Sequence, residues 1–271
     1  MEIIRSGRIH YCAPLFDITA VAATVQGFTT RHEGVSRPPY NSLNLGMNTD
    51  DSPHNIEGNR SILTRAFGIS QDRLVTVQQT HGSDILAIDA QNDDYSHFLE
   101  LEADAIITNQ PGMMIGVTVA DCVPVLLFDP VKGVIGAVHA GWQGCAAQIT
   151  RQAVQGMEQL FGSRPQDIQA AIGPCIGPCC YEVDQPVKDG FDKNRTPWES
   201  VAKSSAPGKW RLDMALVNRM QLEEVGVPSA AIQSSGMCVC CHRELFFSYR
   251  RDNGETGRQM GFIMLTVTEK N

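Results

Sequence analysis

The sequence of 271 residues has few basic side chains, and none of them form a dense cluster. It carries 22 lysines and arginines against 30 aspartates and glutamates, which gives a net charge of −8. Proteins that bind nucleic acids present basic patches to the phosphate backbone. We therefore expect small-molecule partners and no nucleic acid.

The sequence also lacks a hydrophobic run long enough to cross a bilayer. Its most apolar stretch, 113–128, is interrupted by Asp121 and Pro124. The first residues, Met1 to Arg5, lack the basic start, apolar segment and cleavage site of a signal peptide. These features predict a cytoplasmic protein with no membrane partner. The sequence does not fix the oligomeric state, so a monomer or a small homo-oligomer is expected.

The nine cysteines are an odd number, and without a secretion signal they favour reduced thiols over a disulfide framework. They include two clusters, Cys175/Cys179/Cys180 and Cys238/Cys240/Cys241, the second followed by His242. These clusters would resemble a second zinc or iron–sulfur site if they met in space. We recognise no clean Cys-x-x-Cys pair in them, so buried or incidental thiols are the simpler interpretation and no second metal is predicted.

The hydrophobic pattern predicts more strands than helices. Helical spacing of apolar residues indicates helices at 53–67, 149–160 and 213–224, the first with Ser52 as a capping hydroxyl and Pro53 at its first position. We expect strands at 74–77, 84–89, 103–108, 114–119, 124–128, 134–138, 168–172, 230–234, 244–249 and 260–267. Segment 31–48 reads as a long ordered loop, 91–96 as a polar loop and 194–208 as a flexible one. Because several strands follow one another without a helix, an α+β fold of mixed sheets flanked by helices fits better than a doubly wound one.

Three residues at strand ends could share one metal ion: His81, Cys122 and His139. Catalytic zinc takes three protein ligands and leaves a fourth position open, whereas structural zinc fills all four. Each residue also has a simpler interpretation. A lone histidine is more often a core or surface residue than a metal ligand. Cys122 could equally be a buried thiol, or a nucleophile activated by His139.

Several residues could contact an anion or a planar ring. Arg31 stands at the head of the Gly/Asn-rich loop, while Arg250, Arg251 and Arg258 lie near the C-terminus, and the guanidinium fork suits phosphate oxygens. Surface ion pairing, with Asp252 and Glu255 as partners, is the alternative. Trp142 could stack on a ring or belong to the core.

Eight sequence motifs stand out: 31–36 (RHEGVS), 42–46 (SLNLG), 79–82 (QTHG), 120–127 (ADCVPVLL), 139–142 (HAGW), 172–174 (IGP), 180–183 (CYEV) and 248–252 (SYRRD). Together these motifs resemble the laccase-domain family, in which the proteins are variously called multicopper polyphenol oxidases, peptidoglycan editing factors and purine nucleoside phosphorylases. They run in order through nearly the whole chain, so residues 1–271 are expected to form one catalytic domain. Glu33 and Gln143 depart from the usual glycine and arginine, away from the proposed ligands.

The resemblance implies that His81, Cys122 and His139 bind zinc and form the catalytic centre. It also implies that the enzyme splits adenosine, inosine and guanosine with phosphate into base and ribose 1-phosphate, and can deaminate adenosine. Substrate contacts are then expected from Arg31, Asn44, Gln79, Asp121, Trp142, Arg250 and Arg258. The sequence lacks the full His-x-Glu…Pro-Cys-x-x-Cys signature of the zinc nucleobase deaminases, so Asp121 or a water chain is the candidate acid or base for deamination.

Two other activities compete with this one. A cysteine-type amidase using Cys122 and His139 would fit the peptidoglycan editing members, which act on a muramyl precursor. A copper polyphenol oxidase is the weaker alternative, because multicopper oxidases need His-x-His pairs and none of the seven histidines forms one.

Overall fold

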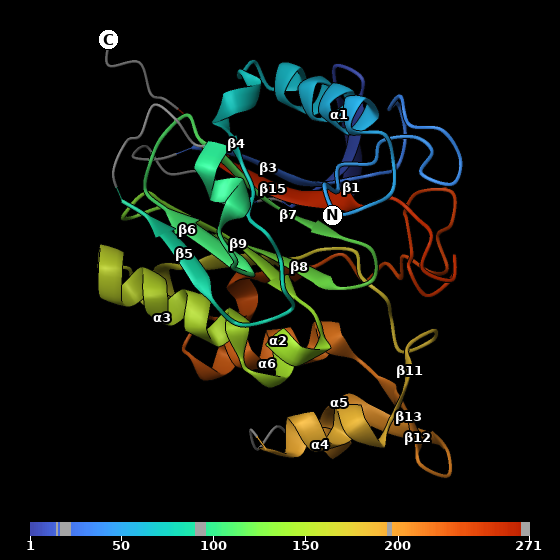
Figure 1. Cartoon of the computed structure of the whole chain (residues 1–271). Helices are drawn as coiled ribbons and strands as arrows, with labels where there is room; N and C mark the ends of the chain where they lie inside the picture. Colours follow the sequence, from blue (N-terminus) through green and yellow to red (C-terminus); the bar gives the residue numbers. More distant parts are fainter. Residues whose placement is uncertain (15, 17–22, 90–95, 194–196, 267–271) are drawn as a thin grey trace.

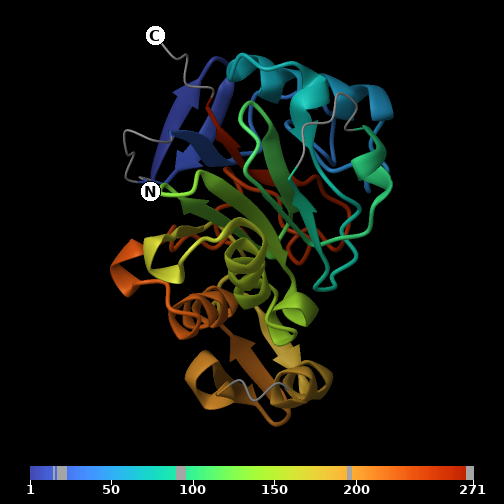
Figure 2. The same cartoon turned by 90° about the vertical axis from the view of Figure 1, so that its left-hand side faces the viewer.

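The computed structural model describes residues 1–14, 16, 23–89, 96–193 and 197–266, and the side chains of 96 and 97 are not described. Two six-stranded sheets pack face to face, and a small third sheet projects from one end (Figures 1 and 2). The expected α+β class with mixed sheets and flanking helices is confirmed. Within these ranges, none of the helices is both long and apolar enough to cross a membrane.

The first sheet is antiparallel except where β4 joins β7. Its strands, in spatial order, are β1 (Glu2–Ser6), β2 (Ile9–Ala13), β3 (Thr24–Thr29), β15 (Gln259–Leu265), β7 (Met114–Val119) and β4 (Leu74–Val75). The second sheet has parallel pairs at both edges, β10 with β14 and β5 with β6. Its strands are β14 (Ile232–Ser234), β10 (Gln169–Ile172), β8 (Val123–Asp129), β9 (Val134–Ala140), β6 (Ala105–Thr108) and β5 (Ile85–Ile88).

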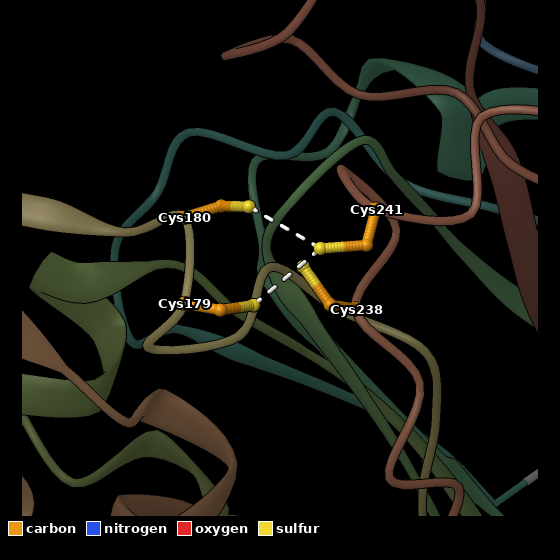
Figure 3. Close-up of side chains that lie close together, drawn as sticks. All are labelled: Cys179, Cys180, Cys238 and Cys241. Atoms are coloured by element: carbon orange, nitrogen blue, oxygen red, sulfur yellow. Dashed lines mark hydrogen bonds between the residues drawn. The ribbon is translucent and has the colours of Figure 1, made fainter.

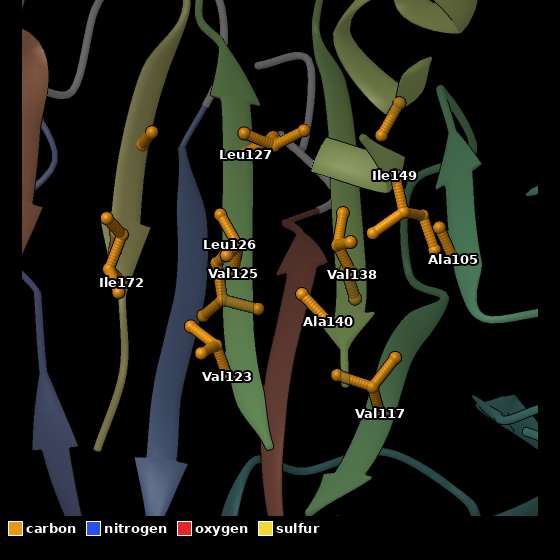
Figure 4. Close-up of a cluster of buried hydrophobic side chains, with 14 of the residues drawn as sticks. Ala105, Val117, Val123, Val125, Leu126, Leu127, Val138, Ala140, Ile149 and Ile172 are labelled. Carbon is orange, nitrogen blue, oxygen red and sulfur yellow. The ribbon is translucent and has the colours of Figure 1, made fainter. Parts of the chain in front are cut away.

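The main core lies between these two sheets and extends to the helices below the second one. Strands β8 and β9 are buried along their whole length, which explains why their sequences are almost continuously apolar. Figure 4 shows part of this core, where Val117 of the first sheet faces the side chains of β8 and β9. The rigid, buried β8–β9 pair carries two of the three candidate ligands at one end.

Six helices cover the sheets in the described residues. Helix α1 packs on the outer face of the first sheet, and α2, α3 and α6 lie against the second (Figure 1). The helices are α1 (Pro53–Ala66), α2 (Trp142–Ala146), α3 (Ile149–Phe161), α4 (Gln185–Lys193), α5 (Trp198–Val201) and α6 (Met214–Glu224). Ser52 does occupy the N-cap of α1, but its hydroxyl makes no capping hydrogen bond.

Two of the expected elements are wrong. The predicted strand 244–249 is irregular, because its apolar residues Phe246 and Phe247 anchor a loop in the core rather than pairing in a sheet. Segment 194–208 was expected to be a flexible loop, but its described part, 197–208, contains α5 and β12 (Ala202–Ala206). Residues 194–196 lie outside the described residues. Strand β12 is polar and mostly exposed, so it has no apolar alternation, and its pairing with β13 (Lys209–Leu212) defines it. The third sheet is completed by β11 (Glu182–Asp184). The expected polar loop 91–96 lies almost wholly outside the described residues.

Candidate active site

The three candidate ligands converge at one end of the β8–β9 pair. His81 lies in the loop after β4, Cys122 immediately precedes β8, and His139 lies near the end of β9. Their ligand atoms, two imidazole nitrogens and one thiol sulfur, all lie within 4.8 Å of one another. His139 is only 2% exposed whereas His81 is exposed, so the group opens to solvent on one side. Among the described residues, the group of His81, Cys122 and His139 offers three metal-ligand atoms, which suits zinc with an open fourth position.

Asp104 organises two of these ligands. Its carboxylate is fully buried and lies 2.7 Å from Nδ1 of His139. It also accepts hydrogen bonds from the backbone N–H groups of His81 at 3.0 Å and Gly82 at 2.6 Å, and from both the N–H and the hydroxyl of Thr80. Since an ionised carboxylate only accepts, Nδ1 of His139 must donate, which leaves Nε2 available for a metal. Burial acts to raise the pKa of Asp104, but these hydrogen bonds and the charge of His139 outweigh it and hold the pKa below its usual range.

The metal-free thiol and imidazole form an ion pair. Burial opposes a thiolate at Cys122, but the charge of His139 and hydrogen bonds from both imidazoles outweigh it and lower the pKa of Cys122 to about 6. Burial likewise opposes an imidazolium at His139, but the Cys122 thiolate and then Asp104 raise the pKa of His139 to about 9. Between these two values the site holds a thiolate, the form of cysteine that binds metals and acts as a nucleophile.

We expect alkylation of Cys122 in the metal-free protein to report this pKa. The thiolate is the reactive form, so the rate should be high above pH 7 and fall as the pH drops through about 6, whereas an ordinary thiol would lose reactivity already below about 8.5. Peptide mapping by mass spectrometry after chelation would measure the rate at Cys122 separately from the other cysteines. A midpoint near 8.5 would show that the imidazoles do not stabilise the thiolate.

Gly141 is needed because a larger side chain would not fit at this position, and not because of its backbone angles. Its φ of −69° is accessible to any residue, so backbone conformation does not explain the glycine. A Cβ at this position would lie 2.9 Å from the His81 ring and 3.4 Å from the Cys122 sulfur. The glycine therefore lets the His-Ala-Gly-Trp segment pass close to both ligands.

The ligands open into a cavity of about 550 Å³, a volume typical of small-molecule sites. Four of the expected substrate residues besides Asp121 line it: Gln79, Trp142, Arg250 and Arg258. The cavity is also lined by Tyr181, Tyr249 and Lys209, which were not expected from the sequence, although Tyr181 and Tyr249 stand inside the recognised motifs. The guanidinium of Arg250 lies over the ring of Tyr181 at 5.1 Å, and that of Arg258 over Tyr249 at 5.6 Å. The cavity therefore combines cations, aromatic rings and the candidate metal ligands.

Asp121 also lines the cavity, but both of its carboxylate oxygens already have partners. One accepts the Ser248 hydroxyl at 2.6 Å and the other the backbone N–H of Arg250 at 2.6 Å. Burial raises the pKa of Asp121, while these hydrogen bonds act in the opposite direction. Its φ of 96° is unfavourable for a residue with a side chain, and the bonds to the 248–250 segment help to hold it there. Asp121 thus ties Arg250 to the strand end that carries Cys122.

The structure places Arg31 and Asn44 outside this cavity. Arg31 donates to the Asn41 and Arg243 carbonyls, lies over Phe247 and lines a separate cavity with Arg243 and Arg251. Asn44 is fully buried, and its amide oxygen accepts the backbone N–H of Arg258 at 2.9 Å. The expectation that Arg31 and Asn44 contact the same substrate as Arg250 therefore does not match the geometry. The loop 31–48 folds against the C-terminal segment instead, and Asn44 positions Arg258.

Comparisons with known proteins give a consistent result. The family model described as multi-copper polyphenol oxidoreductase laccase matches residues 25–266. A purine nucleoside phosphorylase of Geobacillus stearothermophilus is 36% identical over 248 residues, covering 89% of this chain and 90% of that protein. A purine nucleoside phosphorylase of Deinococcus radiodurans is 39% identical over 247 residues, covering 91% of each. The crystal structure of YlmD from Geobacillus stearothermophilus covers 97% of this chain and 98% of its own, with a TM-score of 0.89 and 34% identity. The chain therefore belongs to the multi-copper polyphenol oxidoreductase laccase family.

Proposed function

We propose that the protein is a zinc-dependent purine nucleoside phosphorylase that cleaves adenosine, inosine and guanosine and also deaminates adenosine. One observation carries the proposal: His81, Cys122 and His139 face a cavity that also contains two arginines and three aromatic rings. Relatives that match nine-tenths of the chain are named purine nucleoside phosphorylases, which supports the same reaction class.

The donor set suits zinc. One thiolate and two imidazoles are ligands that zinc accepts in catalytic sites, and the buried Asp104 holds His139 in the tautomer that leaves Nε2 free. Zinc bound there would supply electrophilic polarisation of a substrate atom or of water. Copper is the alternative raised by the family description, but the candidate groups in the described residues contain no cluster of histidines such as a trinuclear copper site needs.

The remaining cavity residues would bind the substrates. Arg250 and Arg258 would hold phosphate by charge-assisted hydrogen bonds beside the ribose carbon that it attacks. Trp142, Tyr181 and Tyr249 offer ring faces to the purine. Phosphate then takes the place of the base on the ribose, and the base leaves with a proton.

Product analysis tests this function. The zinc-loaded protein should convert adenosine with phosphate into adenine and ribose 1-phosphate, and should form inosine with or without phosphate. Omitting phosphate should abolish adenine and leave inosine. If neither product forms, or if adenine forms equally well without phosphate, the proposal is wrong.

A cysteine hydrolase is the second candidate, and one observation favours it. Cys122, His139 and Asp104 are connected in the order nucleophile, base and orienting carboxylate. This arrangement would hydrolyse an amide without a metal. The presence of His81 beside Cys122 favours the metal, because a thiol nucleophile needs only one base.

Replacing Arg250 with lysine should raise the KM for phosphate about tenfold, since the loss of one bidentate, charge-assisted contact costs about 1.5 kcal/mol. The KM for the nucleoside should change much less. Arg31→Lys is the matched control, because Arg31 lies outside the cavity and should leave both constants unchanged. Equal effects of Arg250→Lys on both constants would indicate a structural arginine, and a phosphate effect of Arg31→Lys would contradict the placement of the anion site.

A further inference from the structure

A second group of thiols lies outside the cavity. It consists of Cys179 and Cys180, from the loop between β10 and β11, and Cys238 and Cys241, from the loop after β14 (Figure 3). Strands β10 and β14 pair in parallel, and the bridge between Cys175 and Cys238 continues that pairing. Because parallel strands end at the same edge of a sheet, the two loops emerge side by side. The two cysteine clusters of the sequence therefore meet.

The sulfur atoms are spaced for a metal ion rather than for a disulfide. Sγ of Cys241 lies 3.6 Å from that of Cys179 and 3.4 Å from that of Cys180, and all four sulfurs lie within 4.8 Å of one another. A disulfide would require about 2.05 Å. A tetrahedral zinc ion with bonds of about 2.3 Å separates its sulfurs by about 3.8 Å. An iron–sulfur cluster places several irons and sulfides between its thiolates and would need wider spacing.

We propose that Cys179, Cys180, Cys238 and Cys241 bind one zinc ion in a closed, four-thiolate structural site. Four protein ligands leave no position for substrate, in contrast to the His81/Cys122/His139 group. Cys238 and Cys241 are in fact a Cys-x-x-Cys pair, with Cys240 between them, and the sequence analysis overlooked it. The inference does not depend on the proposed phosphorylase activity.

The surroundings of the four sulfur atoms include one hydrogen bond to a thiolate and two arginine contacts to the backbone of the cysteine loops. The backbone N–H of Gly177 lies 3.2 Å from Sγ of Cys238, a contact that stabilises a thiolate. Arg211 donates to the carbonyl of Cys179 at 3.1 Å, and Arg251 donates to the carbonyl of Val239 at 2.9 Å. Both guanidinium groups therefore contact the backbone of the cysteine loops, and each is also paired with a carboxylate, Arg211 with Glu182 at 3.7 Å and Arg251 with Asp252 at 2.7 Å.

Zinc at this position would fix one wall of the cavity that contains His81, Cys122 and His139. Tyr181 and Glu182 directly follow Cys180, and the Arg250 guanidinium lies over Tyr181 and donates to the Glu182 carbonyl at 3.0 Å. Cys238 and Cys241 precede the segment that carries Arg250. The ion would thus join the loop of Tyr181 to the segment of Arg250 from outside the cavity, since none of the four cysteines lines it.

Zinc analysis of the full chain, purified with zinc and without chelators, tests the proposal. We expect about two equivalents in the unaltered protein, one in the Cys179→Ser/Cys241→Ser variant, one in His139→Ala, and none when all three changes are combined. Cys240→Ser is the matched control and should retain two. If the Cys179→Ser/Cys241→Ser variant keeps as much zinc as the unaltered protein, the four-thiolate site is wrong. If His139→Ala alone loses no zinc, the zinc site proposed for catalysis is wrong instead.

Cobalt substitution gives a readout that does not depend on the folding of the cysteine variants. In the His139→Ala protein, one equivalent of cobalt should produce the strong thiolate-to-metal charge-transfer absorption of a tetrahedral four-sulfur centre. Absence of that absorption, or a disulfide between Cys180 and Cys241 in freshly purified protein, would overturn the proposal.

Discussion

Replacement of Cys122 with alanine should remove one equivalent of zinc and lower kcat for adenosine phosphorolysis about a thousandfold. The thiolate is the anionic ligand of the group, and without it two imidazoles would hold the ion weakly. A metal ion that polarises the reacting atoms contributes several kcal/mol, and about 4 kcal/mol corresponds to a thousandfold in rate. Zinc content and initial rates at saturating phosphate measure the two effects.

Cys12→Ala provides the control for loss of a buried thiol. Cys12 lies in β2 opposite Phe28, is fully buried and lines neither cavity. This variant should lose some stability and keep its zinc and its rate. If Cys122→Ala keeps all of its zinc, Cys122 is not a ligand. If its kcat is unchanged, the site does not take part in catalysis.

Asp104→Asn should weaken zinc binding at the catalytic site by about 10–100-fold and lower the free energy of unfolding by about 2–5 kcal/mol. An aspartate at this position accepts hydrogen bonds from His139, His81, Gly82 and Thr80. An asparagine side chain would turn an NH₂ group toward some of these donors, and it would no longer hold the His139 tautomer by charge. Zinc competition titrations and urea unfolding followed by circular dichroism measure the two losses.

Asp129→Asn is a close control because Asp129 is also fully buried. Only one of its oxygens accepts hydrogen bonds in the turn after β8, from the N–H groups of Val131 and Lys132, and an asparagine retains such an oxygen. We expect no change in zinc affinity and a smaller loss of stability than for Asp104→Asn. Equal effects of the two substitutions on zinc affinity would show that Asp104 does not position the ligands.

The sequence predicted the parts of this fold that obey a local pattern. The helix expected at 53–67 is α1, because helical periodicity follows from which face is buried. The apolar segment 124–128 lies within β8, because that strand is buried along its whole length and its apolar run is continuous. Strand β12 was missed because its pairing with β13, rather than an apolar alternation, defines it. Segment 244–249 was expected to be a strand because it is apolar, but its apolar residues are buried in the core without pairing in a sheet.

The candidate site likewise contains some residues that the local sequence points to and others that only the tertiary structure brings in. His81, Cys122 and His139 were proposed because they have the chemistry of metal ligands and stand in motifs that resemble the family, and the structure brings their ligand atoms within 4.8 Å of one another. Asp104 was not identified, since its bond to His139 spans 35 positions of the chain and its local sequence does not point to that partner. An acidic residue beside a buried apolar strand was the available signal. Arg31 lines a different cavity from Arg250, because loop 31–48 folds onto the C-terminal segment, and the sequence pattern does not show which cavity a loop residue lines.

Alkylation of Cys122 with and without a chelator tests the metal-centred account most directly. A thiolate bound to zinc is shielded, so the zinc-loaded protein should react slowly at Cys122 and keep its phosphorolytic activity, while chelation should abolish activity and expose the thiol to rapid alkylation. Peptide mapping distinguishes Cys122 from the other eight cysteines. Activity that survives chelation and disappears when Cys122 of the untreated enzyme is alkylated would contradict the account and establish Cys122 as a nucleophile.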